Sequence, residues 1–270
     1  MVRKYIINII LIIVALGMAF PIFWMIALSF KANPETHDTI TKLFFSEYSF
    51  TNYWKALSSD SFDIYLLNSV IVSTVVTLGN ILFCTLTGYA LARKKFKGNK
   101  IIMLSIIGVM MIPPHVIMIP LYRTMVNFDW INTYQALIVP WLITPFGVFL
   151  VKQYLSNIPD AIENAAIIDG ANQFQIIFKI IFPLAKPIII VLAVYIFLMN
   201  WNSFLFPFLF TNNAEYWTLP VGLTFYMGKQ SINWGQLMSG ASMSAIPIIL
   251  IFLLFQKQII KGLTAGAIKE

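Results

Sequence analysis

The sequence predicts an all-α integral membrane protein with six transmembrane helices and a cytoplasmic helix-turn-helix loop between spans four and five. The first observation is composition: 59% of the 270 residues are hydrophobic and only 11% are charged, whereas a soluble domain carries about 25% charged residues. The second is the alternation of long apolar runs with short polar segments. Such runs can cross a hydrocarbon core about 30 Å thick. Residues 1–270 are therefore expected to form a single transmembrane domain.

The expected spans cover residues 5–30, 66–91, 101–122, 134–152, 187–210 and 237–260. The first run could instead be a cleaved signal peptide, but its apolar region exceeds the usual length of about 7–15 residues. Span three contains Pro113 and Pro114, which remove two backbone donors and should break it. A broken helix at membrane depth is tolerated where it lines a cavity. Both prolines are therefore candidates for a translocation pathway.

The distribution of basic residues predicts the orientation in the membrane. With the N-terminus inside, thirteen Lys and Arg residues fall in cytoplasmic segments and five fall outside. Cytoplasmic loops carry such an excess, so both termini are expected in the cytoplasm. The densest basic cluster, between residues 93 and 100, follows span two. Recognition of anionic lipid or nucleic acid is the alternative for this cluster, but its place beside a span favours a topology signal, and no nucleic-acid partner is expected.

A polar stretch, residues 157–187, interrupts the apolar pattern between spans four and five. Asn157 with Asp160, and Asn172 with Gln175, have the spacing of helix caps whose third helical residue reaches back. Gly170 lies between the two predicted helices and suits the left-handed conformation that ends a helix.

The second of these helices is expected to stop at Pro183. Small side chains at Ala165, Ala166 and Ala171 would leave an accessible surface on the helix-turn-helix. This shape is suited to docking into another protein.

Polar side chains near the outer ends of two spans are candidates for contact with a solute. Asn68 falls in span two, where it could bond a neighbouring helix or line a pathway. Asn200, Trp201 and Asn202 end span five, and amides beside an aromatic face are suited to sugar hydroxyls and to the C–H face of the ring. An outer aromatic belt is the structural alternative for this segment.

The sequence lacks the motifs that would make the chain an enzyme. It contains no G-x-x-x-x-G-K-[ST] phosphate loop, no H-E-x-x-H and no G-x-S-x-G, so neither nucleotide hydrolysis nor a metal or cofactor site is expected. Its one cysteine, Cys84, lies inside an apolar run. The spans hold almost no ionisable residues, which proton-coupled transporters place at membrane depth. Energy for transport would come from a partner.

Residues 163–171 (ENAAIIDGA), followed by residues 180–183 (IIFP) and Pro187, resemble the EAA loop of permease subunits in bacterial ABC importers. Further segments resemble carbohydrate importer permeases of the maltose type: residues 49–53 (SFTNY), 68–69 (NS), 89–93 (YALAR), 111–114 (MIPP), 201–202 (WN) and 262–269 (GLTAGAIK). The resemblance covers most of the chain. It departs from the motif at Asn164, where a glutamate is usual; Glu163 comes one residue earlier.

The resemblance implies a multi-pass subunit of a bacterial cell membrane that forms half of a sugar pathway and works by alternating access. A second homologous permease would complete the pore, an extracellular binding protein would deliver the sugar, and an ATPase dimer would bind ATP and Mg. The loop before the last span, residues 211–233, would dock the binding protein, and the C-terminal tail would contact the ATPase. The coupling residues would be Glu163, Asn164, Ala165, Ala166, Asp169, Gly170 and Ala171.

Two other functions fit parts of the pattern. An ABC importer permease for a non-sugar solute would share the EAA loop, and a binding-protein gene beside this one would distinguish it. A stand-alone channel or secondary transporter would move solute without ATP.

Overall fold

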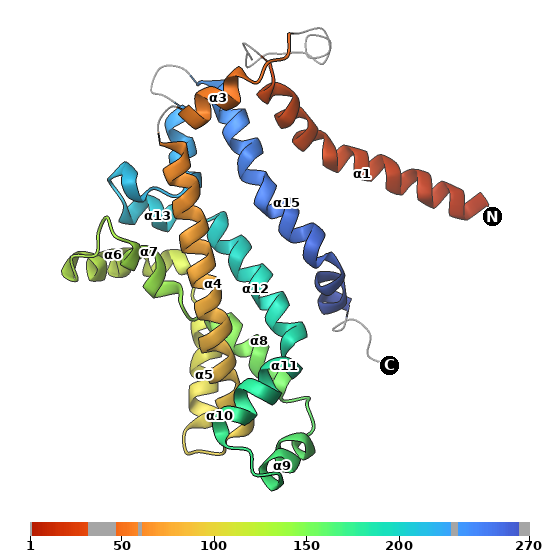
Figure 1. Cartoon of the computed structure of the whole chain (residues 1–270), viewed down its shortest axis with the longest axis vertical. Helices are drawn as coiled ribbons and strands as arrows, with labels where there is room; N and C mark the ends of the chain where they lie inside the picture. The colour runs from red at the N-terminus through yellow and green to blue at the C-terminus, as the bar shows by residue number, and fades with distance from the viewer. Residues whose placement is uncertain (1, 32–46, 59–60, 228–231, 265–270) are drawn as a thin grey trace.

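The computed structural model describes residues 2–31, 47–58, 61–227 and 232–264 (Figure 1). These ranges hold helices and no strand, apart from one isolated antiparallel bridge between Lys31 and Tyr48. Four helical segments are long and apolar enough to cross a membrane: Lys4–Ser29, Phe62–Arg93, Tyr134–Leu155 and Trp234–Gln258. Two bent helix pairs raise the number of possible spans to six if each pair is one span.

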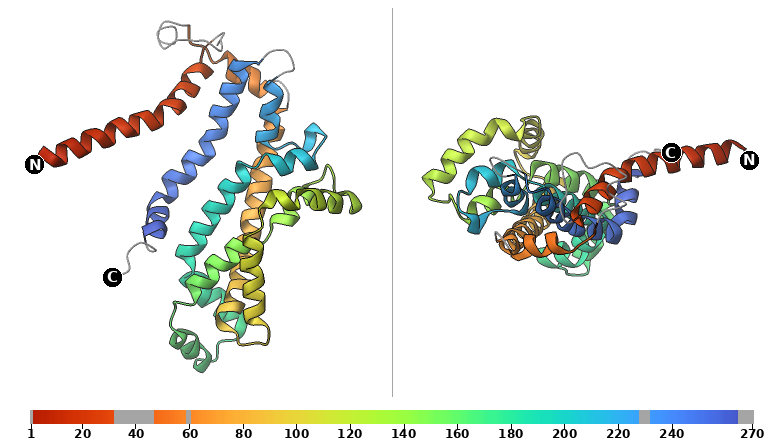
Figure 2. Two further views of the ribbon diagram at one scale, coloured as in Figure 1. Left: turned by 180° about the vertical axis from the view of Figure 1, so that it is seen from behind. Right: turned by 90° about the horizontal axis from the view of Figure 1, so that it is seen from above.

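The longest helix, α4 (Phe62–Arg93), is the central column of the molecule. It packs against α8 (Pro145–Leu155) and α12 (Lys186–Trp201), which lie beside it in both views (Figure 2). Gly88 allows α4 and α8 to approach each other closely, because a Cβ at this position would lie 3.0 Å from the backbone nitrogen of Lys152. The largest buried apolar cluster lies among these helices. The prediction of an apolar second span is confirmed.

Span three is broken where the sequence predicts. Helix α5 (Asn99–Met110) ends before Pro113 and Pro114, and a short 3₁₀ turn, η1 (Pro114–Ile117), leads into α6 (Met118–Asn127). The two halves meet at 93°. Helix α6 consequently projects sideways from the column (Figure 1).

Span four consists of α7 (Tyr134–Ile138), a 3₁₀ turn, η2 (Val139–Trp141), and α8. Asn80 of α4 holds the interruption together: its amide donates to the Trp141 carbonyl (2.6 Å), and its oxygen accepts from the Thr144 hydroxyl (2.8 Å). A buried side chain thereby replaces the backbone bonds that the irregular turn loses. The sequence analysis did not identify Asn80.

The second helix of the polar stretch ends within one residue of its predicted end at Pro183. Helix α10 (Gln173–Gln175) continues through a π-helix, η3 (Ile176–Ile181), into α11 (Phe182–Leu184), and the chain then bends by 75° into α12. A difference of one residue is within the usual spread of helix boundaries.

The predicted end of span five is wrong, because its helix ends at Trp201 rather than at residue 210. A break at residues 202–204 separates it from α13 (Leu205–Phe210). The amide side chains of Asn200 and Asn202 both bond back to carbonyls of the preceding turn, at 2.9 and 2.8 Å. Such local bonds are typical of asparagines at helix ends.

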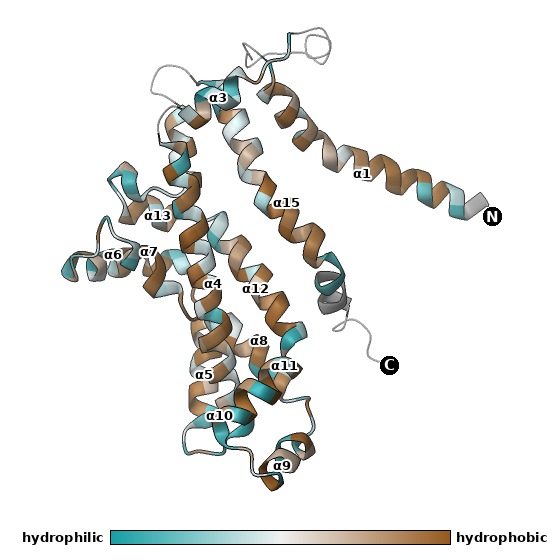
Figure 3. Cartoon of the chain, in the orientation of Figure 1, coloured by the Kyte–Doolittle hydropathy of each residue, from teal (hydrophilic) through white to brown (hydrophobic). Residues whose placement is uncertain are grey.

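The first span lies apart from the column, whereas the last span packs against α12. Helix α1 (Val2–Ser29) meets α15 (Trp234–Thr264) near α3 (Thr51–Ser58) and diverges from it toward the N-terminus (Figures 1 and 2). Three further short elements pack against α4 or α15, namely η4 (Ala214–Tyr216), α14 (Leu219–Leu223) and η5 (Thr224–Tyr226). The long helices are hydrophobic along most of their length, and polar residues gather mainly at their ends (Figure 3).

Candidate coupling site

The polar stretch forms α9 (Asp160–Ile168), a turn, and α10 at the end of the column opposite α3 (Figure 1). The predicted cap at Asn157 is wrong, because α9 begins after Pro159 and the Asn157 amide bonds back to the Gln153 carbonyl. The reason lies in Ile158: a residue that precedes proline is disfavoured in the α conformation. A helix start at Asn157 is therefore disfavoured, and α9 begins at Asp160.

The turn after α9 confirms the other local predictions. Gly170 has a φ of 81°, and the bonds from Gly170 N to Ile167 O and from Ala171 N to Ala166 O close a Schellman turn. Asn172 then caps α10: its side chain accepts from the Gln175 nitrogen (2.9 Å), and the Gln175 side chain accepts from the Asn172 nitrogen (2.8 Å). The polar stretch thus contains two helices joined by a turn whose backbone bonds are satisfied locally.

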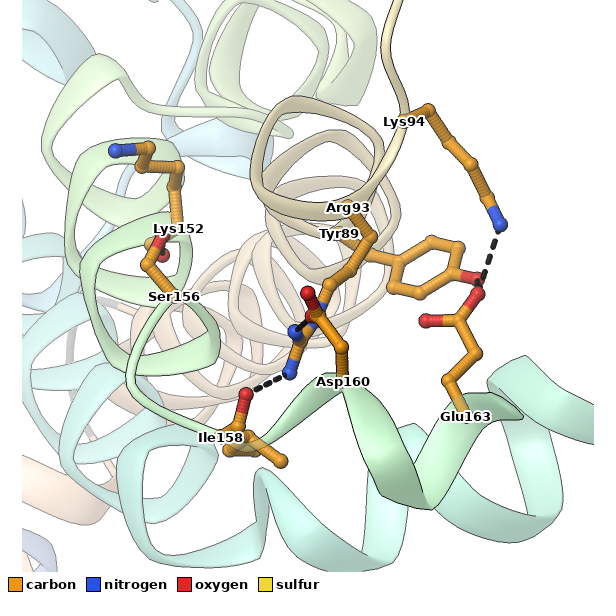
Figure 4. A network of polar contacts seen from close by, with 8 residues as sticks. All are labelled: Tyr89, Arg93, Lys94, Lys152, Ser156, Ile158, Asp160 and Glu163. Carbon is orange, nitrogen blue, oxygen red and sulfur yellow. Dashed lines mark hydrogen bonds and ion pairs between the residues drawn. The ribbon is translucent and has the colours of Figure 1, made fainter. Parts of the chain in front are cut away.

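Glu163 points into the protein and not toward solvent (Figure 4). Its side chain is 11% exposed, and the carboxylate accepts hydrogen bonds from the Tyr89 hydroxyl (2.6 Å) and the Lys94 ammonium (2.8 Å). Gln173 donates to the same Tyr89 hydroxyl (2.7 Å). One buried phenol therefore joins α4, α9 and α10.

A second contact lies one helical turn away. Arg93 of α4 donates to the Asp160 carboxylate and, at 2.5 Å, to the Ile158 carbonyl. The Arg93 side chain is 6% exposed but that of Asp160 is 81% exposed, so water weakens this ion pair. Positions 160 and 163 share a face of α9, as 89 and 93 share a face of α4. Two helix faces are thus joined by two polar contacts.

The charges at this joint stabilise each other. Burial alone would raise the pKa of Glu163, but the hydrogen bonds from Lys94 and Tyr89 outweigh it and lower the pKa below its usual value. Burial alone would lower the pKa of Lys94, whereas its bonds with Glu163 and Tyr89 raise it. Both groups are therefore charged across the physiological range, and hydrogen bonds to ionised groups are the stronger kind.

The other face of α9 is open. Asn164, Ala165, Asp169 and Gly170 are exposed, whereas Ala166 is buried in the core cluster and Ala171 is partly buried against it. Two large apolar side chains extend this open face, namely Ile168 (85% exposed) and Phe174 (75% exposed). Neither residue was among the predicted site residues. With 163 and 166 buried, helical periodicity would have placed 168 on the free side.

The predicted pathway residues are not part of the site around α9, and two of them contact other segments of the chain. Asn68 is buried; its amide donates to the carbonyls of Glu215 (2.8 Å) and Trp217 (2.9 Å) and accepts from the Tyr134 hydroxyl. The Trp201 indole is also buried and donates to the Ser244 carbonyl of α15 (3.1 Å). Both side chains attach other segments to the column.

The remaining pathway candidates are accessible. Pro113, Pro114 and Asn202 are exposed, and Asn200 is partly exposed. Their role in a pathway stays a prediction. Within the described residues, no group of three or more His, Cys, Asp or Glu side chains could hold a metal ion.

Comparison with known proteins identifies the family. Residues 84–264 match the family model described as "Binding-protein-dependent transport system inner membrane component". The trehalose/maltose transport system permease protein MalG of Thermococcus litoralis is 37% identical over 97% of both chains. The arabinooligosaccharides transport system permease protein AraQ of Bacillus subtilis is 34% identical over 93% of this chain and 90% of that protein.

The fold has a counterpart among solved structures. A chain of a bacterial ABC transporter involved in the import of the acidic polysaccharide alginate superposes with a TM-score of 0.85, covering 95% of this chain and 96% of that one at 21% identity. This likeness concerns the fold. Together with the family match and the apolar spans, it leads to one conclusion: the chain belongs to the inner membrane components of binding-protein-dependent transport systems, as the transmembrane subunit of an ABC importer.

Proposed function

We propose that this subunit belongs to a carbohydrate importer. The support comes from relatives whose names specify trehalose and maltose, arabinooligosaccharides, and melibiose, raffinose and stachyose. In this proposal the chain crosses the membrane six times with both termini in the cytoplasm, each bent helix pair counting as one span. A second homologous permease supplies the other half of the pathway, an extracellular binding protein delivers the sugar, and an ATPase dimer binds ATP and Mg.

The observation that carries the coupling assignment is the separation of two faces on α9. The open face, with Asn164, Ala165, Ile168 and Asp169, is free to enter a cleft of the ATPase. The opposite face is joined to α4 through Glu163 and Asp160. Movement imposed on α9 by the ATPase would therefore reach the central column directly. Glu163 acts in this proposal as a positioning residue, and not as a contact with the ATPase.

This division of roles accounts for Asn164. The usual motif glutamate would stand at an exposed position, where Asn164 offers an amide in place of a charge. The exposed apolar side chains of Ile168 and Phe174 supply docking surface beside it. An apolar centre with a polar rim is the common composition of a protein interface.

The translocation pathway in this proposal passes the break of span three and the end of α12. Pro113, Pro114, Asn200 and Asn202 have accessible surface there, and Asn68 and Trp201 hold neighbouring segments in place. The amides would bond sugar hydroxyls, which need both donors and acceptors.

The test is uptake by the reconstituted complex. Proteoliposomes with ATP on the side of the ATPase and the binding protein on the other should accumulate a radiolabelled malto- or arabino-oligosaccharide. Omission of ATP, of the binding protein, or of the ATPase should each abolish accumulation. Accumulation by this chain alone without ATP would overturn the proposal in favour of a secondary transporter, and selective uptake of a non-sugar solute would overturn the substrate assignment.

A further inference from the structure

A cleft of about 820 Å³ lies between α9 and the segment that joins α4 to α5. The contacts of Arg93 and Lys94 with Asp160 and Glu163 join the two walls at one side of this cleft. Its lining combines basic and apolar side chains with the first turn of α5: Leu91, Ala92, Arg93, Lys94, Lys95, Phe96, Gly98, Asn99, Lys100, Ile101, Asp160, Glu163, Asn164 and Ile167.

The cleft has an excess of positive charge. Arg93 and Lys94 are paired with the two carboxylates of the lining, Asp160 and Glu163. Lys95 and Lys100 line the same cleft, and no salt bridge to either is found among the described residues. The buried Nε of Arg93 also has no hydrogen-bond partner. An anion in the cleft would meet two uncompensated ammonium groups.

The backbone adds further donors. Helix α5 starts after Gly98 without a side-chain cap. Within the described residues the Asn99 N–H donates to the Phe96 carbonyl (3.3 Å), and no acceptor is found for the N–H groups of Lys100 and Ile101. The first residues of α5, Asn99, Lys100 and Ile101, are part of the lining. The exposed N-terminus of a helix attracts an anion through these donors and through the helix dipole. Lys100 in this turn would otherwise be unfavourably placed with respect to the dipole.

The apolar surface next to the cleft limits the kind of anion. Ile101 lines the cleft and is 70% exposed, and Leu104, one turn further along α5, is 67% exposed. None of the residues of α5 is buried. A small soluble anion would leave this surface uncovered, whereas an acyl chain would cover it. Basic pockets beside membrane helices on the cytoplasmic side are suited to anionic lipid headgroups.

We propose that the cleft binds the phosphate headgroup of an anionic phospholipid, with an acyl chain lying along α5 at Ile101 and Leu104. Lys95, Lys100 and the first turn of α5 bind the phosphate. The proposed ATPase docking uses mainly the other face of α9, at Ala165, Ile168 and Asp169, and Asn164 is the one residue that belongs to both surfaces. Free phosphate shares the headgroup chemistry but cannot use the apolar surface.

The test compares two double variants of the full-length chain, each assembled in its transport complex. Each complex is first placed in nanodiscs that contain phosphatidylglycerol and phosphatidylcholine and is then extracted from them. Lys95→Gln with Lys100→Gln removes both cleft lysines. Lys4→Gln with Lys97→Gln removes the same charge from two positions that do not line the cleft. Native mass spectrometry then counts phosphatidylglycerol that stays bound after washing in neutral detergent. Size-exclusion chromatography checks that both variants are folded.

Because one lysine near an anionic surface strengthens binding by roughly fivefold, the cleft variant should retain phosphatidylglycerol about twentyfold more weakly. The control variant should stay within about twofold of the unaltered chain, and inorganic phosphate should not displace the lipid. Equal loss in both variants would mean diffuse attraction and would overturn the site. Displacement by inorganic phosphate would identify a soluble anion instead. Lipid binding only after removal of the ATPase would show that the ATPase covers the cleft, which also contradicts the proposal.

Discussion

The two ends of α4 are fastened to the rest of the molecule by different chemistry. At the end that carries α9, the inner end in the proposed orientation, Tyr89, Arg93 and Lys94 bind carboxylates of α9. At the opposite end, the outer one in that orientation, Asn68 and Ser69 bind backbone groups of residues 215–219, including the Leu219 nitrogen at 2.7 Å. The inner joint is charged and joins side chains of two helices. The outer joint is neutral and fixes the path of a loop.

The difference corresponds to what each end has to do. A side-chain joint between two helices can transmit a rotation while each helix keeps its own backbone bonds. Bonds from a side chain to loop carbonyls fix a shape, because the loop has few bonds of its own. We therefore expect changes at the inner joint to affect coupling, and changes at the outer joint to affect loop shape and stability.

The largest effect is expected at the corner of the coupling loop. Gly170→Trp places a bulky side chain where the left-handed backbone disfavours any Cβ and where the open face meets the ATPase. Sugar-stimulated ATPase activity should fall more than tenfold while the protein still reaches the membrane. Gly170→Ala introduces the strain without the bulk, since no atom lies within 4 Å of the added Cβ. If Ala reduces activity as much as Trp, turn strain and not docking is responsible.

Next in size is the inner joint itself. Glu163→Ala removes the acceptor of Tyr89 and Lys94 and leaves the buried Tyr89 hydroxyl without an acceptor, at a cost of about 1–3 kcal/mol. Coupling, measured as sugar transported per ATP hydrolysed, should fall severalfold with assembly intact. Asp160→Asn is the matched control on the same helix face, because its exposed ion pair contributes little. Equal effects of the two substitutions would contradict the assignment of Glu163 as the main joint.

At the outer end, Asn68→Ala should release the loop at residues 215–217. Two hydrogen bonds to carbonyls are lost, which costs about 1–2 kcal/mol. Thermal unfolding in detergent should occur at a lower temperature, and stimulation of ATPase by the binding protein should weaken, while basal ATPase activity stays the same. A fall in basal activity as large as that of Glu163→Ala would remove the distinction between the two ends.

A smaller effect is expected for Trp201→Phe, which keeps the stacking on Phe197 but loses the bond to the Ser244 carbonyl. Stability should fall by about 1 kcal/mol, and uptake kinetics should change little. Asn202→Ala at the exposed neighbouring position should instead raise the KM for sugar uptake. Reversal of these two results would place Trp201 in the pathway and Asn202 outside it.

The smallest effect is a dependence on pH confined to the inner joint. Because the pKa of Glu163 is lowered in the folded protein, its ionised carboxylate stabilises the fold at pH values above the usual carboxyl pKa of 4.5. This stabilisation is lost as the pH falls through the pKa of the folded state. Because the pKa of Lys94 is raised, its ammonium group stabilises the fold at pH values below the usual lysine pKa of 10.5. This stabilisation is lost as the pH rises through the pKa of the folded state. Hydrogen exchange of α9, corrected for intrinsic rates, should speed up in acid. Loss of this acid step in Glu163→Gln would confirm its origin, and an equal step at residues 214–226 would contradict it.

Sequence reasoning succeeded where the signal is local. Gly170, the capping box of Asn172 and Gln175, and the break at Pro113 and Pro114 all follow from backbone chemistry within a few residues. It failed at Asn157, where the effect of Pro159 on its neighbour overrode a cap signal.

The direction of the Glu163 side chain could not be predicted in this way. Its partner Tyr89 is 74 positions away in the sequence, and a glutamate in an exposed-looking helix has no local feature that shows which face will be covered. The same holds for Asn80 and the turn of span four, which meet only through the packing of α4 against α8.

The hydrogen bonds of Asn80 restrict which side chains can replace it in related proteins. Its side chain donates to the carbonyls of Val76 and Trp141 and accepts from the hydroxyl of Thr144 and the thiol of Cys84, so both amide donors and the oxygen are in use. Aspartate would lose both donors, glutamine would be too long, and alanine would leave the carbonyl of Trp141 without its partner. Related permeases should therefore lose this asparagine only together with the interruption in span four, so the two features should vary as a pair across lineages.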